Sequence, residues 1–90
     1  MGSDPSPLNL SGTIEESGYV HPHAYVRLKT EGKTWLVVLA PPSRMENRDL
    51  PPAMLDKGSR ATVYGYPNRG KPEELRAERI TIDNKTTELR

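Results

Sequence analysis

The sequence predicts an all-β protein, a five-stranded OB-fold-like Greek-key barrel with a short helical insertion between strands 3 and 4. Five segments show the apolar alternation or the β-branched run that is typical of strands. Residues 41–58, between the third and the fourth of them, contain two Pro-Pro pairs and predict a short helix. This order of elements is that of the OB-fold. An SH3-like barrel is the main alternative, and it normally lacks so long a helical segment.

The first two strands are predicted from a period of two. In the first, inward positions from residue 8 onward carry Leu8, Leu10, Gly12 and Ile14. A glycine on the inward face commonly marks a bulge or a close approach of another backbone, so Gly12 suits a sharply bent barrel. In the second strand the inward positions are Ala24, Val26 and Leu28, and the outward positions are Tyr25, Arg27 and Lys29.

The third strand is predicted over residues 34–40, a nearly continuous apolar run that indicates burial on both faces. A helix follows, which Ser43 can cap and which ends near Asp49, with a second turn over 53–55. The fourth strand is expected over 61–66. The fifth is expected over 75–82, with a bulge near Glu78 and Arg79 because its apolar positions change phase there.

Ninety residues suit one domain with one small core. Residues 1–7 have neither a charged nor an apolar segment of a signal peptide and are expected to form a disordered leader. The barrel is assigned to 8–83, and 84–90 are expected to be a polar, frayed C-terminal tail. No apolar run is long enough to cross a bilayer, and we expect a monomer.

Composition excludes several classes of function. Thirteen Lys and Arg against twelve Asp and Glu give a formal charge of +1, so no field of one sign develops. The absence of Cys excludes disulfides, thiolate catalysis and Cys-ligated metal sites. The two histidines lie together with no nucleophile near them in sequence, and there is no Gly-rich phosphate loop. We therefore expect a protein that is not an enzyme.

His21 and His23 form the first candidate site. In an extended segment, residues two apart project to the same side, so both imidazoles can share one ion. Copper is the first metal to consider, because imidazole suits it and the thioethers of Met45 and Met54 would help its monovalent form. The alternative is that His23 hydrogen-bonds a carbonyl of its own loop and that His21 is solvated.

A second candidate is a binding surface of Tyr25, Arg27 and Trp35 on the outer face of strands 2 and 3. OB-folds bind single-stranded nucleic acid there by stacking and phosphate contacts. The balanced charge argues against nucleic acid and favours a protein partner. In the alternative interpretation, Trp35 packs at the barrel mouth.

Several stretches resemble a family of small exported bacterial proteins of unknown function, whose signature is Asn-Pro-His-Ala before a strand and a Trp on the next strand. The resemblance covers about residues 9–83 and is most specific at Pro22-His23-Ala24 and Trp35, with His21 in place of the usual Asn. It implies an OB-like barrel in the periplasm or outside the cell. A weaker similarity, to periplasmic copper-binding OB-fold chaperones, implies copper binding through His, Met and Trp; the residue types match and their spacing does not.

Overall fold

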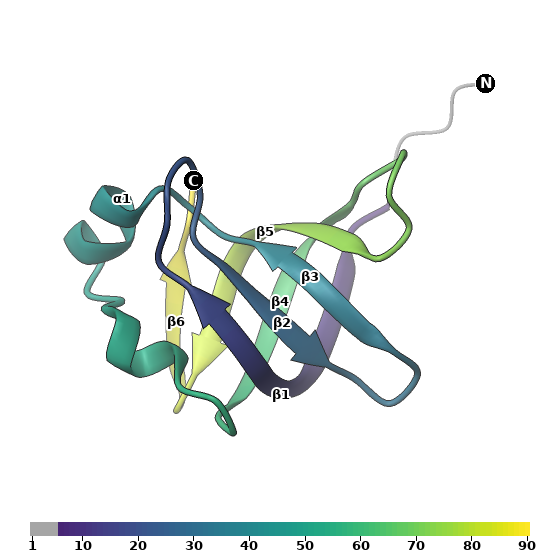
Figure 1. Cartoon of the computed structure of the whole chain (residues 1–90), viewed down its shortest axis with the longest axis horizontal. Coiled ribbons are helices and arrows are strands. Elements are labelled where there is room, and N and C mark those ends of the chain that lie inside the picture. Colours follow the sequence, from purple (N-terminus) through teal and green to yellow (C-terminus); the bar gives the residue numbers. More distant parts are fainter. Residues whose placement is uncertain (1–5) are drawn as a thin grey trace.

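The computed structural model describes residues 6–90 (Figure 1). In chain order its elements are β1 (Leu8–Gly18), β2 (Tyr25–Lys29), β3 (Thr34–Val38), α1 (Pro42–Asn47), the 3-10 helix η1 (Pro52–Leu55), β4 (Arg60–Pro67), β5 (Glu74–Ile82) and β6 (Lys85–Glu88). Most of the leader that the sequence predicts lies outside the described residues. Within them, no helix is long and apolar enough to cross a membrane.

The first five strands close into a mixed barrel. The sheet order is β3-β2-β1-β4-β5-β6, and a parallel pairing of β3 with β5, from Leu36↔Glu74 to Val38↔Arg76, joins the two sides. The remaining pairings are antiparallel. With α1 and η1 between β3 and β4, the predicted fold class is confirmed.

The core lies inside this barrel and extends under α1 and η1. Inward positions of β2, β4 and β5 alternate as predicted, so that Val26, Val63 and Ile80 are fully buried. In β3 the expected burial on both faces is wrong: Val37 is fully buried, whereas Leu36 and Val38 on the other face are partly exposed. One end is closed by three more buried side chains: Met45 of α1, Leu50 of the segment between the helices, and Leu55 of η1. Figure 1 shows α1 and η1 on the side of the barrel where β6 lies.

Two irregularities shape the barrel where the sequence predicts them. A Cβ at Gly12 would collide with the carbonyl group of Lys29, so β1 and β2 approach here as only glycine allows. In β5 the register shifts as Tyr64 pairs with Arg79 and Gly65 with Ala77, which leaves one extra residue between them. The predicted bulge is therefore present.

Residues 84–90 differ from the expected frayed tail. A two-residue turn, with Asp83 and Asn84 at φ 53 and 64, leads into β6, which pairs with β5. Leu89 follows β6 and is fully buried. Asp and Asn tolerate the left-handed region, so this turn suits the twist of a hairpin.

The end of β3 and the start of α1 also differ in detail from the prediction. Strand β3 ends at Val38, and its outward side chains stay partly exposed because no second layer covers them. The N-cap of α1 is Pro41, with no side-chain capping bond, so Ser43 lies inside the helix and does not cap it. The proline in the first turn starts the helix instead.

Candidate binding face

The outer face of β2 and β3 carries the candidate site. The cross-strand pairs Tyr25↔Val38 and Arg27↔Leu36 have outward side chains that are at least partly exposed. The loop between β1 and β2 borders this face on one side. The loop between β4 and β5 borders it on another, because β5 pairs with β3.

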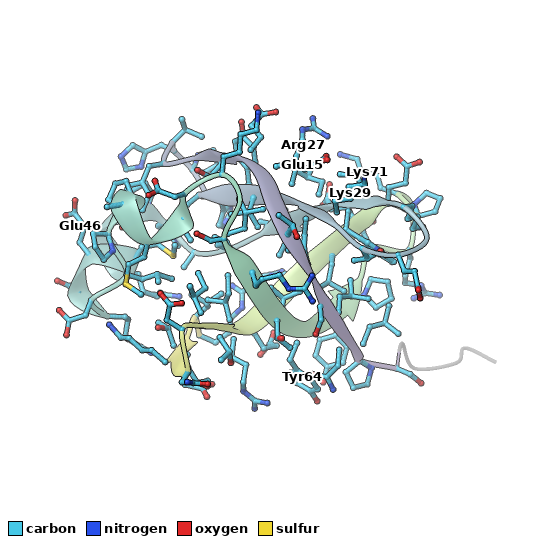
Figure 2. The ribbon with its side chains drawn as sticks, turned by 90° about the horizontal axis from the view of Figure 1, so that it is seen from below. Glu15, Arg27, Lys29, Glu46, Tyr64 and Lys71 are labelled. Carbon is cyan, nitrogen blue, oxygen red and sulfur yellow. The ribbon has the colours of Figure 1, made fainter. Side chains whose placement is uncertain are left out.

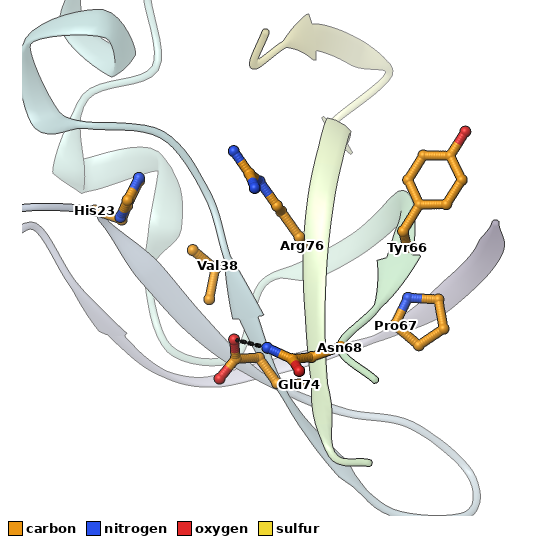
Figure 3. Close-up of a pocket in the computed structure, with 7 residues that line it drawn as sticks. All are labelled: His23, Val38, Tyr66, Pro67, Asn68, Glu74 and Arg76. Atoms are coloured by element: carbon orange, nitrogen blue, oxygen red, sulfur yellow. Dashed lines mark hydrogen bonds between the residues drawn. The ribbon is translucent and has the colours of Figure 1, made fainter. Parts of the chain in front are cut away.

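Three hollows follow one another across this face. The first (Figure 3) is lined by His23, Val38, Tyr66, Pro67, Asn68, Glu74 and Arg76. The second shares His23 and Val38 with the first and continues over the loop between β1 and β2. The third shares Arg27 and Leu36 with the second and continues to the loop between β4 and β5. Because neighbouring hollows share lining residues, they form one open depression, which we call the β2–β3 groove.

The floor of the groove is apolar. Leu36 and Val38 form its centre, and Val20, which is 50% exposed, and Pro22 continue it along the loop between β1 and β2. Tyr66 stands at its other side with 37% of its surface exposed. An apolar floor with a few polar groups around it is the usual composition of a ligand-binding hollow.

Charged side chains at the rim are mostly paired. The guanidinium of Arg27 lies 3.4 Å from the Glu16 carboxylate, which also accepts a hydrogen bond from the Tyr25 hydroxyl. The Lys71 ammonium is 3.9 Å from the carboxylate of Glu74. These exposed pairs contribute only tenths of a kcal/mol each to stability, so they are available for exchange with a ligand.

Arg76 is the exception among the cations of the groove. Within residues 6–90 its side chain has neither a hydrogen bond nor an ion pair with another residue. Figure 3 shows it between His23 and Tyr66. Its five N–H donors therefore have no partner among the described residues.

The loop between β4 and β5 is held in one shape. The Asn68 side chain accepts a hydrogen bond from the Gly70 amide at 2.8 Å and donates one to Glu74 at 3.0 Å. The Lys33 ammonium donates to the Pro72 carbonyl at 3.1 Å and lies 4.2 Å from the centre of the Trp35 ring. A wall with these contacts is pre-organised, which lowers the entropic cost of binding.

The sequence-predicted metal residues are only partly brought together. His21 and His23 are exposed and line the same hollow, next to the cationic Arg27. Met45 is fully buried in the core, and Met54 packs against that core. The described residues contain no group of three or more His, Asp or Glu side chains placed to hold a metal ion.

The predicted surface residues separate into two sets. Tyr25 and Arg27 lie on the outer face, as the alternation of β2 predicts. Trp35 pairs with Leu28, whose side chain is fully buried, so its ring belongs to the inward side and packs against the core. Trp35 therefore does not line the groove. It contacts Lys33, whose ammonium also bonds the Pro72 carbonyl in the loop between β4 and β5.

Sequence reasoning missed Tyr66, Asn68, Glu74 and Arg76. The alternation of β4 and β5 predicts outward side chains at two of these positions, Tyr66 and Arg76. Their place in the groove, however, depends on the parallel pairing that sets Arg76 opposite Val38. That pairing joins strands far apart in the chain, and no local pattern reveals it.

Comparison with known proteins gives a likeness of fold. No protein-family model matches the chain, and no curated protein does. Among solved structures, a complex of TiaS with tRNA and ATP matches with a TM-score of 0.65 and 20% identity, over 84% of this chain and 18% of that one. A ZRD-deleted TiaS mutant with agmatine matches with a TM-score of 0.65 and 20% identity, over 93% and 24%.

Apo TiaS, a tRNA agmatidine synthetase, gives a TM-score of 0.64 at 20% identity, over 84% of this chain and 18% of that one. The chain thus spans about a fifth of the length of these TiaS chains. At this identity the match concerns the fold alone. The protein is a small β-barrel that resembles one domain of TiaS.

Proposed function

We propose that this protein is a non-enzymatic binding module that takes an extended segment of a partner protein in the β2–β3 groove. The observation that carries the proposal is the continuous apolar floor formed by Leu36, Val38, Val20 and Pro22. It lies on the face, and between the two loops, with which OB-type barrels bind long ligands. An accessory module outside the cytoplasm is the role that the resemblance to exported proteins suggests.

The chemistry of the groove suits a polypeptide. Its floor is aliphatic, so it favours apolar side chains of a ligand and offers little surface on which bases would stack. Tyr25 and Tyr66 at the rim have the amphipathic rings that are enriched in protein interfaces. Glu73 and Glu74 line the end near loop 68–73, and they would repel a continuous chain of phosphates.

Single-stranded nucleic acid is the second candidate. The observation in its favour is the exposed Tyr66 ring beside Arg76, which has no side-chain partner within residues 6–90, since stacking and a cation are what such ligands need. One of the similar TiaS structures is a complex with tRNA, at an identity too low to carry function. Binding of this kind would weaken steeply with salt.

Copper binding is a separate proposal that rests on His21 and His23 in one hollow. Two imidazoles leave an open coordination shell, so the affinity for copper would be modest. Titration of the protein with divalent and monovalent copper, followed by amide NMR, tests it. An unchanged affinity in the variant with His21→Ala and His23→Ala would exclude these ligands.

The experiment that tests the main proposal is a selection of random 12-residue peptides on the immobilised protein. An enriched peptide is then titrated into isotope-labelled protein, and we expect amide shifts concentrated at residues 20–28, 36–38 and 66–76. Leu36→Gln should lower the affinity for that peptide by about tenfold, because it makes the centre of the floor polar. A control variant, Thr62→Gln, changes an exposed outward position on β4 and should bind normally.

Figure 2 shows that Arg27 and Lys71 lie on one side of the barrel, while Tyr64 of β4 lies on the opposite side. The control therefore samples a different face. Two outcomes would overturn the proposal: no enrichment of peptides above background, or shifts that map to the β4 side and respond to Thr62→Gln. Tighter binding of a six-base oligothymidine, with a steep salt dependence, would favour the second candidate.

A further inference from the structure

Four arginines converge where β6 ends, and we call them the arginine patch: Arg44, Arg48, Arg76 and Arg90. Two come from α1 and the residue that follows it, one comes from β5, and the fourth follows β6. The guanidinium of Arg44 donates to the Leu89 carbonyl at 3.3 Å. That of Arg48 donates to the Glu88 carbonyl at 2.7 Å and the Arg90 carbonyl at 3.5 Å. Main-chain oxygens of the segment after β6 thus position Arg44 and Arg48.

Among the described residues, one carboxylate pairs with an arginine of the patch. Glu78 pairs with Arg90 at 3.4 Å, and their side chains are 33% and 26% exposed. The neighbouring Glu88 pairs instead with Arg79. Within residues 6–90, Arg44, Arg48 and Arg76 have no ion pair.

Arg90 lies within reach of other charges of the patch. Burial is the largest cause that lowers the pKa of Arg90, and the charges of Arg76 and Arg44 lower it further. The Glu78 carboxylate acts in the opposite direction, through its charge and through its hydrogen bond with Arg90. Arg76 and Arg44 are therefore close enough to Arg90 for their charges to repel it, and an anion placed among them would relieve that repulsion.

The patch also has donors to spare. A guanidinium has five N–H groups, and its fork matches the two oxygens of a carboxylate. Arg44 uses one contact and Arg48 two, and Arg90 also donates to the Ala77 carbonyl at 3.3 Å. Arg76 uses none within the described part of the chain, so it is the most available of the four.

Arg76 connects the patch with the groove. Its side chain lines the hollow with His23 and Val38 (Figure 3), and its charge acts on Arg90. A segment that follows the apolar floor toward the loop between β1 and β2 therefore meets the patch. Charge complementarity then requires acidic groups on that part of the ligand.

We propose that the arginine patch binds the carboxylates of the partner segment, so that the partner carries Asp or Glu beside the apolar residues that fill the groove. This inference rests on the proposed function and adds the charge of the ligand to it. Carboxylates are favoured over phosphates because the cations form a local cluster, while Glu73 and Glu74 line the far end of the groove.

Fluorescein-labelled hexaglutamate is the probe, since it has carboxylates and no apolar side chain. We expect saturable binding by fluorescence anisotropy that weakens as salt is raised from about 50 to about 300 mM. The variant with Arg76→Gln and Arg90→Gln should lose about tenfold in affinity, as expected for two lost charge-assisted contacts. Arg76→Gln alone removes no hydrogen bond of the described fold and should lose about threefold.

The matched control is Lys57→Gln with Arg60→Gln, which removes the same charge from the exposed turn before β4 and from the exposed first residue of β4. Equal losses in the control and the patch variant would overturn the inference, because the attraction would then be non-specific. Tighter binding of hexathymidine at the patch would overturn it as well, in favour of phosphate.

The test separates this inference from the proposed function. Leu36→Gln should leave hexaglutamate binding unchanged while it weakens the selected apolar peptide. If hexaglutamate does not bind and the apolar peptide does, the groove stands and the patch inference fails. If hexaglutamate binds and no peptide is selected, the patch binds anions but is no part of a peptide site, and the proposed function fails.

Discussion

Replacement of Leu89 by Ala tests the most unexpected part of the fold, the segment after the turn at 83–84. Leu89 is fully buried, and its amide donates to the Glu78 carbonyl at 2.8 Å. The change removes three carbon atoms at about 0.8 kcal/mol each, which gives ~2.4 kcal/mol before any cavity term. Since the surrounding barrel strands relax only in part, the expected loss is ~2.5–4 kcal/mol in the free energy of unfolding.

A domain of this size has roughly 5–13 kcal/mol of stability in all, so such a loss is large. Urea unfolding followed through the single tryptophan, Trp35, measures it, because that ring packs against the core. In thermal unfolding the midpoint should fall by about 10–25 °C. The control is Val20→Ala, which trims an aliphatic side chain that is 50% exposed and should change stability by less than about 0.5 kcal/mol. A loss below about 1 kcal/mol for Leu89→Ala would mean that 84–90 form the loose tail that the sequence predicts.

Three further substitutions probe the barrel. Thr87→Val should stabilise the protein by about 1 kcal/mol in urea unfolding, since the buried Thr87 hydroxyl has no partner among the described residues; a loss would indicate a hydrogen bond to water. Gly65→Ala should destabilise by about 1–3 kcal/mol, because its Cβ would press on the β5 backbone at Arg76; an unchanged midpoint would contradict this close approach. Burial, and then Glu46, raises the pKa of the Tyr19 hydroxyl above 10.0, and this hydroxyl donates to the Leu50 carbonyl. The wild type should therefore have a higher free energy of unfolding than Tyr19→Phe below about pH 10, and this difference should vanish as pH rises through the raised pKa of Tyr19. A difference that stays constant above pH 10 would refute this prediction.

Local patterns predicted the strands because residues two apart along a strand point to the same face of the sheet. The bulge near Glu78 and the close approach at Gly12 were predictable for the same reason: a change of phase and an inward glycine are visible in a single strand. The helical insertion followed from its prolines. The prediction that Ser43 caps this helix was wrong, because the helix already begins at Pro42, whose ring fixes the first turn.

Residues 84–90 were missed because their composition is polar and only Leu89 is large and apolar. The available signal was the Asp83-Asn84 pair, which favours a two-residue hairpin turn. Trp35 was missed differently. Residues 34–40 are apolar without alternation, so the sequence cannot assign its ring to one face, whereas the pairing with Leu28 does so at once.

The candidate site depends on closure of the barrel, and this explains why its most informative residue was hidden. Along the chain Arg76 is one more outward charge on a strand. The parallel pairing with β3 sets it opposite Val38, at the edge of the apolar floor, and β6 brings Arg90 to its other side. A single side chain thereby joins an apolar groove to a cluster of cations. For this reason Arg76→Gln should weaken binding of both the selected apolar peptide and hexaglutamate, whereas Leu36→Gln should weaken binding of the peptide alone. That difference is expected if the natural ligand has both apolar and acidic parts.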